Sequence, residues 1–185
     1  MINEKYKGQY RVTSARWAGY DYGQNGAYFI TICTKEQQRY FGEIILPNGS
    51  WESAVLHENP QAAVARYCWE QITVRFPFVV PDAFIIMPDH IHGVLVFDKP
   101  NNTLPDLAYT NKFAPQKENL AAVVRGFKAG VTSLTQQQKL PFAWQPRFHD
   151  RVIRTGNEQE RIQRYLLENP ARWKDEQHQP DSIFR

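Results

Sequence analysis

Residues 84–97 read FIIMPDHIHGVLVF. Apolar segments lie on both sides of Pro88-Asp89, a dipeptide that favours a turn. We therefore expect one strand over residues 79–87 and a second over residues 90–97, joined as a hairpin in the middle of the chain.

The second strand of this hairpin carries a pair of histidines. Side chains two positions apart project from the same face of a strand, so His90 and His92 point the same way and Ile91 points to the other face. Two adjacent imidazoles can share one divalent cation, and Gly93, which has no side chain, would leave room for a substrate. The alternative is two histidines that merely occupy a half-exposed strand. A complete metal site would need a third ligand from elsewhere in the chain.

Strand and helix patterns alternate on both sides of the hairpin. The other expected strands or extended segments are 27–34, 41–46 and 148–153. The expected helices are 59–75, 120–138 and 157–168. In the first helix, the residues expected to face the core are Ala63, Val64, Tyr67, Cys68 and Ile72. Asn169-Pro170 would end the last helix. This mixture indicates the α+β class, with a mainly antiparallel sheet and helices packed on it.

Length and composition indicate a single globular domain over residues 1–185. The chain has 185 residues, of which 42% are hydrophobic, enough for one core. We interpret residues 98–117 as a long surface loop and residues 174–185 as a polar tail. No run of about 18 apolar residues exists, so no membrane span is expected, and the start lacks the apolar core of a signal peptide. Cys33 and Cys68 are expected to be buried thiols in a reduced cytoplasm.

A tyrosine near the end of the chain has polar residues one turn away on each side. Residues four apart share a helix face, so Arg161, Tyr165 and Asn169 would form one stripe. A nearby cation would favour the phenolate of Tyr165 and make it a better nucleophile, and Asn169 offers an amide oxygen to a hard cation. The alternative is packing, because Ile162, Tyr165 and Leu166 also have the spacing of a buried stripe. Spacing alone does not choose among the nine tyrosines.

Basic residues cluster in two parts of the chain. Residues 121–154 contain six basic residues against one acid, and the first 17 residues contain four against one. Such clusters favour phosphate backbones. The expected DNA contacts are Arg16, Trp17, Arg125, Lys128, Arg147, Arg151, Arg154 and Arg161. Trp17, Trp144 and Phe148 could stack on bases, with core packing as the alternative for these aromatics.

Several segments reproduce, in order, the pattern of a known family. They are RW at 16–17, YDY at 20–22, GAYFITICT at 26–34, FGEI at 41–44, FIIMPDHIHG at 84–93, VRGFKA at 124–129, WQ at 144–145, FHDRVIR at 148–154 and YLLENP at 165–170. In these segments the chain resembles the IS200-like single-domain tyrosine (HUH) transposases, and especially their repeat-associated (REP-associated) members.

The resemblance implies a ferredoxin-like antiparallel sheet with helices packed on one face, plus a late helix carrying the tyrosine. It implies Mg²⁺ or Mn²⁺ held by His90, His92 and Asn169, although relatives place different polar residues at this last position. Tyr165 would attack single-stranded DNA, usually hairpin-forming, and leave a 5′-phosphotyrosine. The group commonly has Asn where this chain has Asp89, which we interpret as a cap of the hairpin in preference to a charge near the metal. For the oligomeric state, the resemblance allows both a monomer and a homodimer.

Three other functions are weighed against DNA cleavage and rejoining. A replication-initiator or relaxase-type nickase would use the same chemistry, although a transfer relaxase is usually longer. A non-catalytic DNA-hairpin-binding protein would have no need of both histidines and the tyrosine. A metal-dependent nucleotide hydrolase of the histidine-triad type would carry a third histidine where this chain has Val94.

Overall fold

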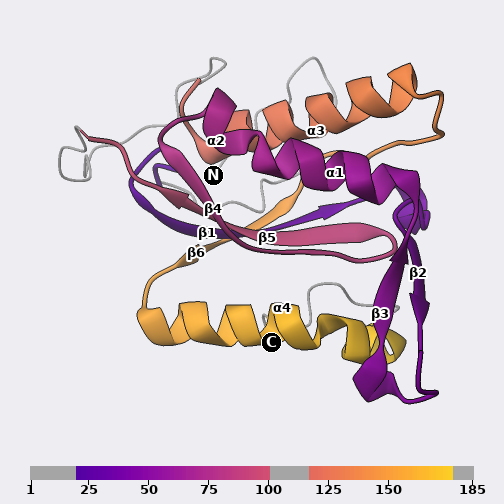
Figure 1. Ribbon diagram of the computed structural model, residues 1–185. Coiled ribbons are helices and arrows are strands. Elements are labelled where there is room, and N and C mark those ends of the chain that lie inside the picture. The colour runs from indigo at the N-terminus through magenta and orange to yellow at the C-terminus, as the bar shows by residue number, and fades with distance from the viewer. Residues whose placement is uncertain (1–19, 101–116, 177–185) are drawn as a thin grey trace, which may run out of the picture.

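The computed structural model describes residues 20–100 and 117–176 (Figure 1). Arg16, Trp17, most of the expected 98–117 loop and residues 177–185 lie outside the described part. The strands are β1 (Gly26–Cys33), β2 (Gly42–Ile45), β3 (Val55–Glu58), β4 (Val79–Ile86), β5 (His90–Phe97) and β6 (His149–Ile153). The helices are α1 (Pro60–Glu70), α2 (Ile72–Arg75), α3 (Leu120–Gln137) and α4 (Gly156–Glu176), with short 3-10 turns at Lys35–Gln37 and Trp51–Ser53.

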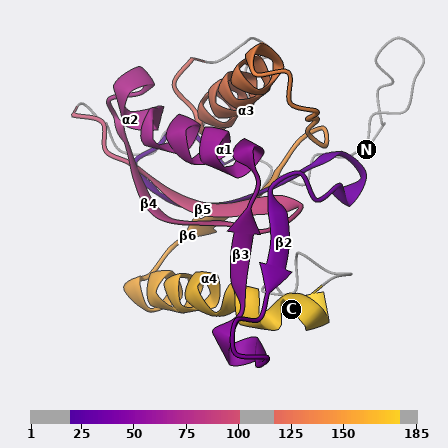
Figure 2. The same cartoon turned by 45° about the vertical axis from the view of Figure 1, so that its right-hand side comes forward.

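Four strands form the main sheet in the order β4-β5-β1-β6, and every neighbouring pair is antiparallel. With α1 between β1 and β4, and α3 between β5 and β6, the chain follows the β-α-β-β-α-β ferredoxin-like pattern. Helices α1, α2 and α3 cover one face of the sheet and α4 covers the other (Figures 1 and 2). The expected α+β, ferredoxin-like class is confirmed, and β5 is a central strand.

The alternation of side chains along the central strands creates two separate cores. Tyr28, Ile30 and Ile91 lie in the larger core under α1 and α3. Phe29 and Val94 lie in the smaller core, which includes Ile153, Ile162, Tyr165 and Leu166. Both faces of β5 are therefore covered, and the histidine positions share a face with the smaller core.

A second, two-stranded sheet pairs β2 with β3 and crosses beside α4 (Figure 2). The sequence predicts β2 but not β3, which is short and ends in the polar residues His57 and Glu58. Gly42 allows the pairing to begin, because its φ is +139° and a Cβ there would lie 2.1 Å from the His57 carbonyl oxygen.

The first helix differs from the prediction in its length and in its buried face. It divides at Gln71 into α1 and α2. Ala63 and Tyr67, both expected inside, are exposed, and Tyr67 is 53% exposed. The physical reason is Trp69, whose ring stacks on Phe84 at a centroid distance of 4.4 Å. Burying this large ring rotates the helix away from the predicted stripe.

The last helix does not end before Asn169-Pro170. It continues through Pro170 to Glu176, so the predicted boundary is wrong and the first residues of the expected tail are helical. A proline inside a helix removes one hydrogen bond and costs about 3 kcal/mol. Trp173 offsets this cost, because its ring is 4% exposed and lies between His90 and the Arg39 guanidinium.

Gly93 leaves room for a neighbouring side chain and not for a substrate. A Cβ at this position would lie 2.3 Å from Cη2 of Trp69. Trp69 belongs to the larger core, so Gly93 faces away from the histidine pair. The expectation that it opens a path to the histidines is therefore wrong.

We expect Gly93→Ala to lower the free energy of unfolding by about 1–3 kcal/mol, because the added methyl group overpacks the core against a rigid ring. Gly156→Ala is the matched control, since a Cβ there would meet nothing within 4 Å. Urea unfolding of both variants checks this, and a Gly93→Ala protein as stable as the wild type would show that Trp69 can move aside.

Candidate functional site

The two histidines face one another across a short gap. His90 Nε2 and His92 Nε2 are 3.1 Å apart, and the ring centroids are 4.5 Å apart. His90 is 3% exposed and His92 is 0% exposed. The strand geometry predicted the shared face, but the alternative of a half-exposed pair does not hold, because both rings are buried.

Each imidazole is oriented by a hydrogen bond at its other nitrogen. His90 Nδ1 lies 2.6 Å from Asp89 Oδ1, and the nitrogen must donate because a carboxylate only accepts. His92 Nδ1 lies 2.8 Å from Thr31 Oγ1 on the adjacent strand. A hydroxyl can donate or accept, so it accommodates either tautomer of His92. Partners of this kind fix ring orientation in metal-binding histidines.

Asp89 does not cap the hairpin, contrary to the expectation from the sequence. Its carboxylate bonds to His90, which places a negative charge beside the pair. The hairpin is instead closed by the backbone hydrogen bond from Met87 N–H to the His90 carbonyl, and a second bond, from Thr34 N–H to the Asp89 carbonyl, joins its turn to the end of β1.

Burial, together with the neighbouring His90, holds the pKa of the His92 imidazole well below its usual range. The ring is therefore neutral at physiological pH and keeps a lone pair available on one nitrogen. Phe29 stacks on its face at a centroid distance of 5.3 Å, which further restricts the ring.

Helix α4 covers the pair with one line of side chains. Tyr165, Asn169 and Trp173 are separated by four residues each, so they share the face turned to the sheet. The Tyr165 ring lies edge-on to His92 at 5.6 Å, and Trp173 lies 6.0 Å from His90. Asn169 lies between these two contacts along the helix and is 0% exposed. The structure therefore brings Tyr165, His90 and His92 together within one chain, and Asn169 is buried one turn after Tyr165 on the same helix.

Two positions near this centre are not identified by sequence reasoning. Thr31 contacts His92 only through the register between β1 and β5, which the sequence does not encode locally. Trp173 continues the Tyr165 stripe by two turns, but Pro170 conceals this because a proline normally predicts the end of a helix.

The donor set fits a divalent cation. Two ligands at right angles on a cation with bonds of about 2.1 Å lie about 3.0 Å apart, close to the 3.1 Å between the two Nε2 atoms. Within residues 20–100 and 117–176, no group of three or more His, Cys, Asp and Glu could hold a metal ion, so a third ligand from these residues would be of another kind, such as an amide oxygen. Imidazole nitrogens favour transition metals, and of the two expected cations Mn²⁺ suits this set better than Mg²⁺.

Polar contacts to both edges of the sheet hold α4 in place. Glu158 accepts from the Arg151 guanidinium at 2.6 Å and from the Arg154 backbone N–H at 3.0 Å. On the other edge, the amides of Gln159 and Gln163 donate to the Asp82 carboxylate at 3.0 and 3.1 Å. These contacts fix the position of Tyr165 over the histidines.

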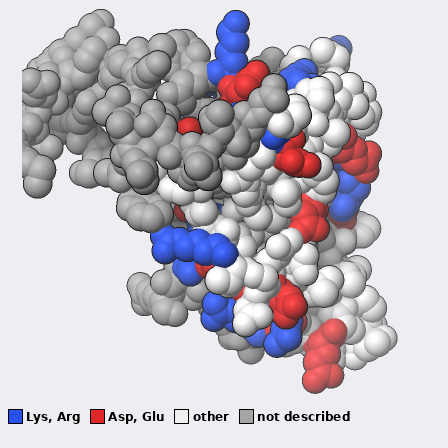
Figure 3. Space-filling model, turned by 90° about the vertical axis from the view of Figure 1, so that its left-hand side faces the viewer, with Lys and Arg blue, Asp and Glu red and all other residues white. Residues whose placement is uncertain are grey.

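The predicted DNA contacts divide between the two faces of the sheet. Arg125 and Lys128 lie on α3 and Arg147 lies beside it, away from the histidines. Arg151 and Arg154 are exposed, but Arg151 is ion-paired with Glu158. Figure 3 shows basic side chains where α4 begins, interspersed with acidic ones.

Two of the predicted residues differ from expectation in their surroundings. Arg161 is exposed, so it does not share the buried position of Tyr165, and it contributes to the electrostatic environment of Glu158. Trp144 packs with Phe41, Phe127 and Phe142, the core-packing alternative for this residue.

A solved protein structure has the same fold as this chain. A REP-associated tyrosine transposase bound to a REP hairpin shares it, with a TM-score of 0.55, 16% identity, and coverage of 87% of this chain and 74% of that chain. The expected resemblance in fold is confirmed. No family model matches the chain, and none of the helices in the described residues is long and apolar enough to cross a membrane.

The sequence itself has a close full-length relative. An uncharacterized protein of Haemophilus influenzae (strain ATCC 51907 / DSM 11121 / KW20 / Rd) is 34% identical over 184 residues, which covers 96% of this chain and 98% of the relative. The chain belongs to the same family as this Haemophilus protein.

Glu158 gives the docking of α4 a pH dependence. Burial alone would raise the pKa of Glu158, but hydrogen bonds from the Arg154 N–H and the Arg151 guanidinium outweigh it and hold this pKa below its ordinary value. The ionised carboxylate therefore stabilises the fold above the unfolded-state pKa, and this stability is lost as pH falls through the lower folded-state pKa. We expect Glu158→Gln to lower the free energy of unfolding by about 2 kcal/mol at neutral pH, and by progressively less in acid.

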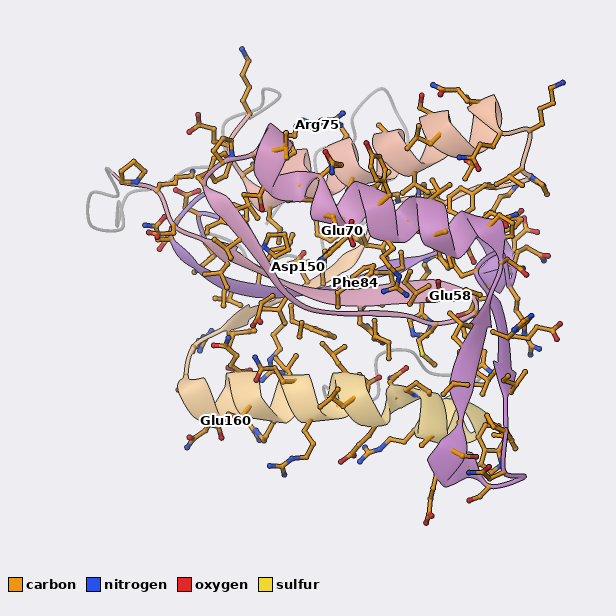
Figure 4. All side chains as sticks on the ribbon, in the orientation of Figure 1. Glu58, Glu70, Arg75, Phe84, Asp150 and Glu160 are labelled. Carbon is orange, nitrogen blue, oxygen red and sulfur yellow. The ribbon has the colours of Figure 1, made fainter. Side chains whose placement is uncertain are left out.

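Glu160→Gln is the matched control, because Glu160 lies on the side of α4 that faces away from the sheet (Figure 4). Denaturant unfolding at several pH values compares the two variants. A loss of stability for Glu158→Gln that does not shrink in acid would show that the ion pair is not its cause.

Proposed function

We propose that this protein is a metal-dependent transposase-type endonuclease that cleaves and rejoins single-stranded DNA through Tyr165. The observation that carries the proposal is the contact of the Tyr165 ring with His92, at the point where His90 Nε2 and His92 Nε2 converge. A tyrosine that served only to pack the smaller core would not require two buried imidazoles beside it, each with a bonded second nitrogen.

In the proposed reaction, the Tyr165 oxygen attacks the scissile phosphorus and loses its proton. The bond between phosphorus and the 3′-oxygen breaks, and the leaving oxygen takes up a proton, so no net proton is consumed. The products are a 5′-phosphotyrosine and a free 3′-hydroxyl. Because the new ester conserves the phosphodiester linkage, a 3′-hydroxyl of another strand can reverse the step and rejoin DNA without a separate energy source.

The surrounding residues have separate roles in this proposal. His90, His92 and Asn169 would hold Mn²⁺ or Mg²⁺, which supplies Lewis-acid stabilisation of charge on the phosphate. Asp89 and Thr31 keep the imidazoles in a binding orientation. Tyr165 and the histidines belong to the same chain, so one copy contains every proposed catalytic group and dimerisation is not required to assemble the site.

We propose hairpin-forming DNA as the partner class. The solved transposase that shares this fold is bound to a REP hairpin, and the sequence carries a basic cluster in residues 121–154. A strand that leaves a hairpin is single-stranded and can bend toward a buried tyrosine, whereas a duplex cannot.

We expect wild-type protein with Mn²⁺ and labelled single-stranded hairpin DNA to form a covalent adduct that survives denaturing electrophoresis, and Tyr165→Phe to form none. Phenylalanine keeps the ring against His92, so the loss would reflect the missing hydroxyl and not unfolding. Tyr67→Phe, at an exposed position of α1, is the control and should form the adduct normally. An adduct that persists in Tyr165→Phe would remove this residue as the nucleophile, and no adduct with any DNA would favour a DNA-binding protein without catalysis.

We expect Thr31→Val to weaken Mn²⁺ binding by about 10- to 100-fold in calorimetric titration, because the oriented partner of His92 is lost while the side chain keeps its shape. Thr135→Val is the matched control: Thr135 is also buried, but its hydroxyl donates to the Val131 carbonyl within α3. Unchanged Mn²⁺ affinity in Thr31→Val would show that His92 does not depend on Thr31 or does not bind the metal.

A further inference from the structure

A surface cavity of about 570 Å³ lies beside α3, within the range of about 300–1,000 Å³ that is usual for small-molecule sites. Its apolar floor includes Val124 and Phe148, and Arg125 and Arg147 stand at its rim as exposed residues. The described residues that line it include no carboxylate. The cavity therefore combines an aromatic and aliphatic surface with positive charge.

Contacts from α3 hold the segment that carries Arg147 and Phe148. The Lys128 ammonium donates to the Gln145 carbonyl at 2.6 Å and to the Arg147 carbonyl at 3.0 Å. The Trp144 indole donates back to the Lys128 carbonyl at 3.1 Å. Arg147 is held in the left-handed region with a φ of 69°, a conformation that costs a non-glycine residue about 1–3 kcal/mol. The wall of the cavity is therefore fixed before any ligand arrives.

This arrangement changes the role expected for Lys128. Burial lowers the pKa of its ammonium, and both carbonyl contacts direct that group toward the backbone. Lys128 is a positioning residue for the cavity wall, and the cations left to meet an anion at the rim are Arg125 and Arg147.

The cavity and the histidine pair lie on opposite faces of the sheet. Phe148 packs against the larger core under α3, whereas Tyr165 belongs to the smaller core under α4. Figure 1 shows α3 and α4 on opposite sides, with β6 at the sheet edge between them. A ligand in the cavity therefore cannot be the phosphate that Tyr165 attacks.

We propose that this cavity binds one nucleotide of the single-stranded DNA outside the cleavage site, with its base stacked on Phe148 and its flanking phosphates on Arg125 and Arg147. The inference rests on the proposed function, which supplies single-stranded DNA as the partner. A site for duplex phosphates alone would need the two guanidiniums but not the apolar floor, whereas an exposed base needs both. The strand then passes around the β6 edge, where Arg151 and Arg154 are exposed.

A scan with abasic oligonucleotides tests the stacking. Binding of single-stranded hairpin DNA is measured in EDTA, so that cleavage does not interfere, with one abasic position moved along the strand. We expect one position at which loss of the base weakens wild-type binding by about 10-fold. In Phe148→Ala the same abasic position should cost little, because the stacking partner is already absent. Equal losses in wild type and variant would overturn the stacking assignment.

Arg147→Gly tests the phosphate contact without loss of stability, because glycine adopts a positive φ freely. Each phosphate contact with a single strand contributes about 0.7 to the slope of log affinity against log salt, so this variant should reduce the slope by about that amount. Lys139→Gly is the matched control: Lys139 also has a positive φ, of 57°, and carries one positive charge, but it does not line the cavity. Equal slopes for Arg147→Gly and the wild type would overturn the proposal.

The outcomes separate this proposal from the proposed function. A wild-type phosphotyrosine adduct together with unchanged binding in the cavity variants would refute the nucleotide site and leave the catalytic proposal intact. Binding that responds to the cavity variants in a protein that forms no adduct with any DNA would support the site and refute catalysis.

Discussion

Strand β5 is covered on both faces, and the alternation of its side chains gives each face a different content. Ile91 and Leu95 enter the larger core under α1 and α3, while His90 and His92 enter the space under α4. Polar groups placed inside a protein are costly unless they are hydrogen-bonded. The two imidazoles are buried where water is excluded, so the protein itself must supply their hydrogen-bond partners. The other features of the site provide these partners.

Three elements supply the hydrogen bonds and ring contacts of the histidines. The hairpin turn provides Asp89, strand β1 provides Thr31, and α4 closes the site with Tyr165 and Trp173. The Nε2 atoms are left facing one another. In the proposed function this arrangement prepares the pair for a cation, because the bonds that orient each ring at Nδ1 exist before the metal binds. The hydrogen bonds that burial of the imidazoles requires are the same bonds that orient the two rings.

The sequence predicts the parts of this structure that depend on local periodicity. The β4–β5 hairpin, the common face of His90 and His92, and the helix at Leu120–Gln137 all follow from it. The class of sheet follows from the order of these elements. What it misses depends on contacts between distant segments: the rotation of α1 about Trp69, the bond from Thr31 to His92, and the burial of Trp173 that carries α4 through Pro170. The expectation for Gly93 fails for the same reason, since the side chain that this residue of β5 accommodates, Trp69, lies on α1.

The proposed function requires that Tyr165 become joined to DNA at the histidine pair of its own chain. The most direct measurement is mass spectrometry of tryptic peptides after reaction with single-stranded hairpin DNA and nuclease trimming. Residues 165–172 form one tryptic peptide with a single tyrosine. We expect this peptide to carry the mass of a nucleotide 5′-phosphate. A nucleotide attached to a peptide that contains any of the other tyrosines would contradict it.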